Sequence, residues 1–557
     1  MSALVPDIAE LLPWLPALAP VSPLGLLVAL VLPPWRGAVL RLTPWAALPA
    51  LLVALAAPPA LLPLPGLLLG GSLQLDQPGR WLLAAVALLW LAGGWLARDW
   101  LCRPRRALAW LLATAGALWL PLVGDLPSAL AASVLAAYPL YGLLSGGRGG
   151  RVLLASVVIA DLLILEALLL LAQVGVGLGF DAMAAALRET QARDLVLALL
   201  LIGFGAKAGV MGVHYWVAPT VADAPARMLG PTVAFTLAGG LLPLLRLLSI
   251  EGVPWPSAAA LLPWLALAGC VWAVAAGTLQ STARARTAYA LSALATVWLG
   301  LLGLEPPAPA PAAVLNDALP PAIAVSGLSV TAMLLACDAP GGRGHLEAWA
   351  LALLSGLLAM LAVLGAAMPT AAGGDAVDWP LTGSAAAVGL LLGASASRPT
   401  RAARHATDHQ AQRVAAVLVA GGLCMAVLAT LLLPLMPSAA TSWSGDRNIL
   451  TILALVGGFA VGLTVVPALA RLPRMPTGDL LVGIERLMTA LMAAWTRLGA
   501  TLGDWRDWFE TAIGHLRAQL GQQPAVDRGE AWLRRWSTAT LLLLMVGAAV
   551  ALLAQPG

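Results

Sequence analysis

The sequence predicts an all-α polytopic membrane protein with about sixteen transmembrane helices and a lateral amphipathic helix near the C-terminus. Three observations carry this prediction. The chain of 557 residues is 60% apolar and only 10% charged, whereas a soluble domain has about 25% charged residues. Its mean hydropathy is +0.89, and apolar runs of transmembrane length recur along the whole chain. The polar gaps between these runs alternate between arginine-rich and arginine-poor.

The apolar runs define the expected spans in order. Each is close to the ~20 residues that cross a hydrocarbon layer of about 30 Å. The expected spans are residues 10–33, 43–64, 81–97, 107–124, 127–144, 152–174, 195–217, 229–249, 259–280, 287–304, 320–337, 347–368, 381–397, 414–434, 449–470 and 537–554.

The arginines predict the orientation of the spans. The arginine-rich gaps are 36–41, 98–106, 148–151, 284–286, 398–413 and 471–474. The alternating gaps, rich in proline, glycine and acids, are 63–77, 124–125, 305–311, 371–380 and 434–446. Because arginine-rich gaps favour the cytoplasmic side, we expect a bacterial-type inner membrane, with the N-terminus outside and residues 471–536 inside.

The composition argues against several other classes of protein. The net charge of +4 is small, and no basic patch indicates a nucleic-acid partner. The four cysteines are far apart and form no CxxC pair, so we expect neither a disulfide framework nor a metal site. They are Cys102, Cys270, Cys337 and Cys424. Because no cofactor motif is present, we expect no bound cofactor and no redox-active centre.

Lys207 is the only lysine in the chain, against thirty arginines, and lies inside the apolar run 195–217. A desolvated lysine can lose its proton, whereas arginine cannot. A titratable cation at membrane depth is costly and is therefore a functional candidate. Lys207 lies about ten residues from each end of the run, too deep to snorkel easily. Gly203, Gly205 and Gly209 flank it, and small residues allow close helix approach or a local helix irregularity.

Two carboxylates and a histidine are the expected partners of Lys207. Asp161 and Glu166 lie inside the run 152–174, and a carboxylate in lipid must find a partner. Their separation of five residues turns them about 140° apart, so we expect one, preferably Asp161, to face the lysine and the other to meet a neighbouring subunit or water. His214 follows Lys207 by seven residues, on the same face of a continuous helix, and is a candidate proton relay. The alternatives are protonated core acids and a helix-capping histidine.

Residues 478–520 differ from the preceding spans. Apolar residues, including Trp495, Trp505 and Trp508, recur at helical spacing among mixed charges. A helix with one apolar stripe lies along the membrane surface rather than across the bilayer. We therefore expect this segment to lie on the cytoplasmic face and to contact a neighbouring subunit; an ordinary cytoplasmic helix is the alternative.

Three segments resemble one family of membrane proteins. The run Gly203-Phe-Gly-Ala-Lys-Ala-Gly, followed by His214-Tyr-Trp and Ala224-Pro-Ala-Arg, resembles the signature of the antiporter-like subunits of respiratory complex I. The same signature occurs in Mrp-type cation/proton antiporters and membrane-bound hydrogenases. The segment beginning Thr282-Ala-Arg-Ala-Arg-Thr-Ala-Tyr resembles a later motif of that family. The motifs cover about residues 70–340, and the rest resembles the family only in architecture.

This resemblance implies two inverted repeats of five helices, each with a discontinuous helix. It divides the chain into 1–106, N-terminal helices; 107–250, a first repeat that holds Lys207; and 251–434, a second, degenerate repeat. The remaining segments are 435–477, a transmembrane helix; 478–530, the lateral helix; and 531–557, a terminal transmembrane helix.

The chain departs from the family at the positions of its relay lysines. In the helix after Lys207 the lysine position is Ala238, and in the central helix it is Val330. The lysine of the later motif is replaced by Arg284, which we consider a cytoplasmic relay candidate. The second discontinuous helix is unrecognisable across residues 350–397.

The resemblance implies a proton-translocating, or cation/proton-translocating, subunit of a complex I-related assembly. Its partners would be other membrane subunits, the bilayer, and protons or sodium ions. A redox arm, a hydrogenase or an inorganic-carbon uptake protein would complete the assembly. The alternative is a structural scaffold that conducts nothing, because the relay lysines at Ala238 and Val330 are missing. We do not expect the chain to be an enzyme on its own.

Overall fold

The computed structural model describes most of the chain up to residue 464. The described residues are 12–64, 71–144, 147–173, 179–248, 261–302, 311–337, 347, 349–359, 361, 379–396, 409–432 and 445–464, with seven positions between 489 and 511. The chain divides into two units, Met1–Leu481 and Val482–Gly557. Everything below concerns the first unit. The predicted lateral helix, apart from these few positions, and the predicted terminal span 537–554 lie outside the described residues.

The N-terminal part of the first unit combines short helices with a β-hairpin. Its elements are η1 (Leu12–Ala17), α2 (Leu18–Val31), α3 (Arg36–Leu42), η2 (Thr43–Trp45), α4 (Leu48–Ala56), β1 (Ala60–Pro63) and β2 (Ser72–Leu75). The strands pair antiparallel, with Ala60 opposite Leu75. The predicted span 43–64 is therefore wrong at its C-terminal end. Its helix stops at Ala56 because Pro58 and Pro59 cannot continue it, and an apolar strand follows.

The middle of the unit holds the helices around Lys207. They are α5 (Gln77–Ala97), η3 (Trp100–Cys102), α6 (Pro104–Trp119), η4 (Leu120–Leu122), α7 (Leu126–Leu143), α8 (Arg148–Ala172), α9 (Phe180–Glu189), α10 (Arg193–Ala208), α11 (Val217–Asp223), α12 (Ala226–Thr236), the π-helical turn η5 (Leu237–Leu241) and α13 (Leu242–Leu248). Asp76 and Asp125 cap α5 and α7, since each carboxylate accepts a hydrogen bond of 2.7 Å from a first-turn backbone N–H.

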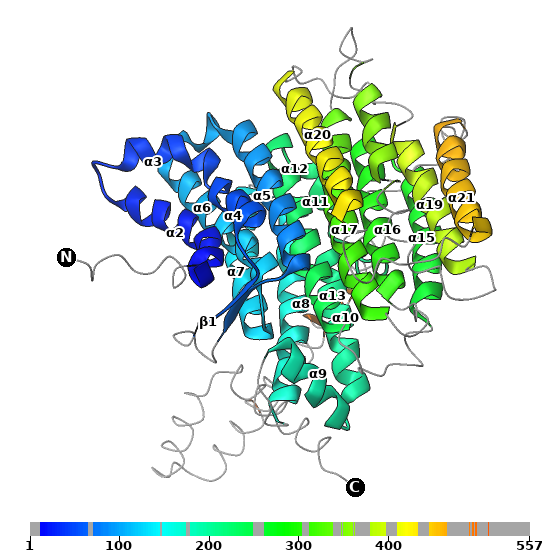
Figure 1. Cartoon of the computed structure of the whole chain (residues 1–557), viewed down its shortest axis with the longest axis horizontal. Coiled ribbons are helices and arrows are strands. Elements are labelled where there is room, and N and C mark those ends of the chain that lie inside the picture. Colours follow the sequence, from blue (N-terminus) through cyan, green and yellow to red (C-terminus); the bar gives the residue numbers. More distant parts are fainter. Residues whose placement is uncertain are drawn as a thin grey trace. The chain divides into compact units, whose positions relative to one another are not determined.

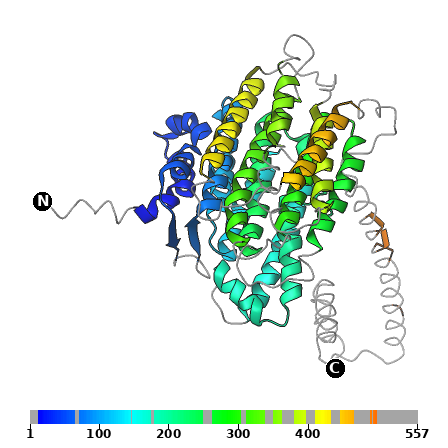
Figure 2. The same cartoon turned by 45° about the vertical axis from the view of Figure 1, so that its right-hand side comes forward.

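The last part of the unit is a set of long helices. They are α15 (Leu262–Thr278), α16 (Ala283–Leu302), α17 (Pro311–Ala336), α19 (Trp379–Ala396), α20 (His409–Leu432) and α21 (Gly445–Thr464). Figure 2 shows α20, in yellow, running along α17 in green, and α5 contacts both. Glycines let α19 and α21 pack backbone to backbone, because a Cβ at Gly389 would meet the Leu455 carbonyl.

The fold is that of an all-α polytopic membrane protein. Among the described residues, seven helices are long and apolar enough to cross a membrane, and the bent pair formed by α3–η2 and α4 passes the same test as one unit. Large apolar side chains, such as Val28, Leu162 and Val271, are more than half exposed on these helices. Exposed apolar side chains are expected where a helix faces lipid rather than water.

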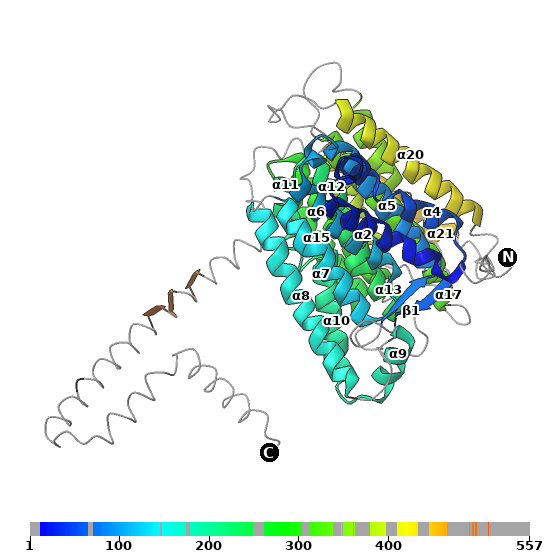
Figure 3. The ribbon, with the colours of Figure 1, turned by 90° about the vertical axis from the view of Figure 1, so that its left-hand side faces the viewer.

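The polar gaps gather at opposite ends of the helix bundle. At the arginine-rich end, Arg284 donates a hydrogen bond of 2.7 Å to the Ala224 carbonyl, and Gln410 donates one of 2.9 Å to the Trp95 carbonyl. At the arginine-poor end, the backbone N–H of Phe180 reaches the Gly124 carbonyl. Figures 1 and 3 both place β1 and α9 at this second end, while Figure 1 shows α11 and α12 toward the first. The alternation in the sequence therefore corresponds to two ends in space.

Candidate functional site

Lys207 lies in the last turn of α10, where the helix is broken. Gly209 adopts a left-handed conformation with φ = +72°, which favours glycine. The Gly209 N–H donates to the Ala206 carbonyl at 3.2 Å, and the Val210 N–H donates to the Gly205 carbonyl at 2.9 Å. This pair of bonds is a Schellman motif, which satisfies the last carbonyls of a helix.

The break corrects two predictions from the sequence. The apolar run 195–217 is not one helix, because α10 ends at Ala208 and α11 begins only at Val217. Lys207 therefore lies one residue from a helix end and not in the middle of a span. His214 lies in the non-helical segment, so the argument that it shares a helix face with Lys207 fails.

The Lys207 ammonium forms a buried ion pair with Asp161. The Nζ atom lies 2.5 Å from Oδ1 of Asp161 on α8, and the two side chains are 1% and 14% exposed. The same Nζ atom lies 5.5 Å from the centroid of the Phe204 ring, within reach of a cation–π contact. A buried charge is costly unless it is paired, and Asp161 supplies the opposite charge at contact distance.

Gly203 permits this pairing by letting α8 and α10 approach closely. A Cβ at Gly203 would lie 2.7 Å from Cγ1 of Ile164 and 3.1 Å from the Ala160 carbonyl. Ala160 is the chain neighbour of Asp161, so the close approach occurs beside the ion pair. Gly205 is different, because a Cβ there would meet only ordinary contacts at 3.8 Å.

Glu166 lies away from this pair. It is exposed on α8, next to Leu165 and near Leu162 and Leu169, which are 39%, 59% and 52% exposed. Asp161 is largely buried on the same helix, and the two positions are about 140° apart at helical spacing. The structure therefore brings Asp161 to Lys207 and leaves Glu166 on the outer face of α8.

His214 is buried in the segment that connects α10 to α11. Its side chain is 1% exposed, and its Nδ1 atom accepts a hydrogen bond of 3.2 Å from the Gly212 N–H. The ring contacts Tyr289 of α16 edge to face at 5.6 Å between centroids. Because Nδ1 is an acceptor here, Nε2 is the nitrogen that would exchange a proton.

The helix break is held by side chains that the sequence interpretation did not identify. Trp216 donates its indole N–H to the Ala206 carbonyl at 2.6 Å, next to Lys207. Thr296 of α16 accepts a hydrogen bond of 2.9 Å from the Met211 N–H. Trp216 stands within the family motif, so its place beside Lys207 was a usable signal. Thr296 is 85 residues from its partner and gave none.

Apolar side chains occupy the positions where the family has further lysines. Ala238 lies in the π-helical turn η5 and Val330 in α17, and both are 0% exposed. A Cβ at Gly240 in the same turn would lie 2.6 Å from the Phe204 carbonyl, so η5 packs directly on the end of α10. Arg284 donates to the Ala224 carbonyl at the end of α11, and no printed contact joins it to Lys207 in the described part of the chain.

A second buried ion pair lies at the arginine-poor end. Arg246 of α13 reaches Asp76 with two hydrogen bonds, of 2.6 and 3.0 Å, although 170 residues separate them. The same guanidinium also donates to three backbone carbonyls, those of Gln74, Pro121 and Val123. The sequence interpretation did not assign this pair.

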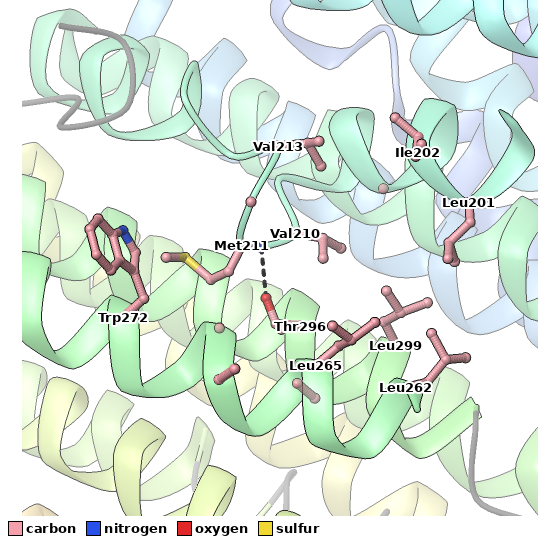
Figure 4. A pocket seen from close by; sticks show the side chains of 15 residues that line it. Leu201, Ile202, Val210, Met211, Val213, Leu262, Leu265, Trp272, Thr296 and Leu299 are labelled. Atoms are coloured by element: carbon pink, nitrogen blue, oxygen red, sulfur yellow. Dashed lines mark hydrogen bonds between the residues drawn. The ribbon is translucent and has the colours of Figure 1, made fainter. Parts of the chain in front are cut away.

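An apolar pocket of about 460 Å³ lies beside the helix break, between α10, α15 and α16. Figure 4 shows Val210, Met211 and Val213 on one side of it and Leu265, Trp272 and Leu299 among the other lining residues. Thr296 carries the single side-chain hydroxyl among the described lining residues, and its oxygen is bound to the Met211 N–H. The pocket lining therefore carries no titratable group, and the chemistry lies at the ion pair instead.

Comparison with known proteins places this fold. Neither protein-family models nor curated protein sequences give a match. Among solved structures, the chain resembles one chain of the Mrp complex from Dietzia sp. DQ12-45-1b, with a TM-score of 0.66 at 17% identity over 98% of this chain and 62% of that one. This chain thus spans about three fifths of that relative's length.

A second solved structure leads to the same fold. It is a chain of the membrane-bound sulfane sulfur reductase, an archaeal respiratory membrane complex. The TM-score is 0.60 at 16% identity, over 81% of this chain and 99% of that chain. The chain therefore has the fold of the antiporter-like membrane subunits of complex I-related assemblies, and the predicted resemblance is confirmed at the level of fold.

Proposed function

We propose that this chain is a proton-translocating, antiporter-like subunit of a multisubunit membrane assembly. Lys207 and Asp161 would be the pair that takes up and releases the proton. The single observation that carries the proposal is their ion pair of 2.5 Å, buried at the point where α10 is broken. The 478–520 segment would contact a neighbouring subunit, and the energy source would lie in a partner.

The proposed mechanism depends on the separation of the two charges. Two unit charges about 4 Å apart attract by about 4 kcal/mol at an effective dielectric constant of about 20, and doubling the separation halves this attraction. A change of about 2 kcal/mol alters the balance between charged and neutral lysine roughly 30-fold. A small movement of the helix end would therefore be enough to release the Lys207 proton.

The surroundings of Lys207 support such a movement. The ammonium is attached to the last turn of α10, whose end is held by the Gly209 turn and the Trp216 indole. Helix ends next to non-helical segments absorb backbone rotation more readily than helix interiors. His214, held on the same segment through Nδ1, is the proposed next proton acceptor through its Nε2 atom.

A non-conducting scaffold is the second candidate function. The observation in its favour is that Ala238 and Val330 are apolar and fully buried at the family's lysine positions. Among the described residues, the only fully buried charged side chains are those of Asp125, Lys207 and Arg246. A scaffold needs no buried Lys207, because replacing a buried ion pair with apolar residues is often neutral or stabilising.

Proton flux after removal of the carboxylate charge tests the proposal. In the purified assembly reconstituted into liposomes, we expect Asp161→Asn to lower the flux by at least about tenfold, because the lost attraction is worth more than 1.4 kcal/mol. Glu166→Gln is the matched control, since it removes the same charge from the exposed face of the same helix, and should keep most of the flux. Equal flux from Asp161→Asn and the wild type would favour the scaffold.

A further inference from the structure

Two arginines from different helices share one tryptophan at the arginine-rich end of the bundle. The guanidinium carbon of Arg106, on α6, lies 4.7 Å from the centroid of the Trp100 ring, and that of Arg227, on α12, lies 4.4 Å from it. Trp100 belongs to η3, between α5 and α6. Two like charges are therefore held against one indole by separate elements of the fold.

No carboxylate neutralises these two charges within the described part of the chain. Arg106 donates a hydrogen bond of 3.4 Å to the Trp100 carbonyl, and the Nε atom of Arg227 is buried there without a hydrogen-bond partner. The nearby acid in the sequence, Asp99, lies 3.8 Å from Arg98 and is 93% exposed. Partly buried like charges repel each other, so their arrangement calls for an anion from outside the chain.

The surroundings of the two arginines have the features of a membrane–water interface. Trp45 and Trp95 are 44% and 39% exposed and contact each other edge to face at 5.4 Å. The Arg98 guanidinium lies over the Trp95 ring at 5.2 Å. Tryptophan and arginine gather where membrane spans end at the headgroup level. The anions present at that level are the phosphates of phospholipid headgroups.

We propose that Arg106 and Arg227 form a binding site for the phosphate of an anionic phospholipid headgroup. Each guanidinium presents paired N–H donors that fit phosphate oxygens, and its stacking on Trp100 fixes its plane. Arg103 and Arg105, both exposed in the same gap, add to the positive potential. The bound lipid would tie the start of α6 to the start of α12. This proposal is independent of proton translocation.

Lipid retention on the purified full-length protein tests the site. Native mass spectrometry would measure binding of phosphatidylglycerol and, as the zwitterionic comparison, phosphatidylcholine. We expect Arg106→Gln/Arg227→Gln to weaken phosphatidylglycerol binding by at least about tenfold, since one charge-assisted hydrogen bond contributes about 1.5–3 kcal/mol. The matched control is Arg36→Gln/Arg41→Gln, which removes two exposed arginines of α3 and should change binding less than about twofold.

Three further arms make the result decisive. Only folded protein is counted in the spectrum, so a folding defect does not imitate a loss of lipid. Arg227→Lys keeps the charge without the paired donors, and we expect intermediate binding. Millimolar inorganic phosphate should leave the lipid bound, because the lipid is anchored by its chains. Equal phosphatidylglycerol binding by the double variant and the wild type, equal binding of the two lipids, or displacement by inorganic phosphate would each overturn the assignment.

Discussion

The two buried ion pairs of this chain differ in how firmly each cation is held. Arg246 has two hydrogen bonds to Asp76 and further bonds to three backbone carbonyls. Lys207 has one carboxylate, Asp161, at 2.5 Å and the face of the Phe204 ring. The guanidinium cannot lose its proton and is bound from several directions, whereas the ammonium can lose its proton and depends on one partner.

This difference distinguishes a structural clamp from a candidate switch. Arg246 ties α13 to the cap of α5 and to η4, so its place is set by segments that do not move independently. Lys207 stands at a helix end next to a non-helical segment, and only the α8 carboxylate holds its charge. A charge with one partner can change its protonation when that partner moves, whereas a charge with five acceptors cannot.

The largest expected effect on stability comes from breaking the clamp. Arg246→Ala leaves the Asp76 carboxylate and the bound carbonyls without their donor, and breaking a buried pair costs about 3–5 kcal/mol. The control is Arg98→Ala, whose exposed pair with Asp99 at 3.8 Å contributes about 0–1 kcal/mol. Thermal unfolding of the purified protein in detergent measures both. A similar unfolding temperature for the two variants would contradict the role of Arg246.

Removing both charges of the candidate switch should have the opposite effect on stability. In Lys207→Met/Asp161→Leu, apolar side chains replace a buried pair, a change that is often neutral or stabilising by about 1–4 kcal/mol. The corresponding Arg246→Met/Asp76→Leu should be destabilised, because it also loses the cap of α5, worth about 0.5–2 kcal/mol. The same unfolding measurement compares the two. If both double variants were equally destabilised, the distinction between clamp and switch would be lost.

A smaller effect is expected at the helix contact beside the switch. Gly203→Ala places a Cβ 2.7 Å from Ile164, and such overpacking costs about 1–3 kcal/mol. Gly142→Ala on α7 is the control, because a Cβ there meets nothing within 4 Å and alanine favours a helix by about 0.5–1 kcal/mol. Opposite shifts of the unfolding temperature are expected. Equal shifts would mean that α8 and α10 do not need the glycine.

Much of the fold was predictable, because a transmembrane helix is a local property of the sequence. The hydropathy of each run and the arginine alternation predicted an all-α membrane protein and which gaps share an end. The hairpin of β1 and β2 was missed because Ala60–Pro63 is apolar and continues an apolar run. Hydropathy does not distinguish a short buried strand from the end of a helix.

The site was predictable only in part. The helical separation of Asp161 and Glu166 predicted that one acid would face Lys207 and the other would point away. The break at Gly209 was misplaced because it depends on a positive φ, which hydropathy does not record. The Arg246–Asp76 pair was missed because its members are 170 residues apart in the sequence. Only the packing of α13 against the start of α5 brings them together.

The most direct test of the central claim is proton flux through the reconstituted assembly that carries Lys207→Arg. Arginine keeps the positive charge next to Asp161 but cannot become neutral in a protein. If Lys207 releases its proton in each cycle, this variant should assemble and yet lose flux by at least about a hundredfold, the loss that follows from about 3 kcal/mol of added barrier. Flux equal to that of the wild type would contradict proton transfer by Lys207.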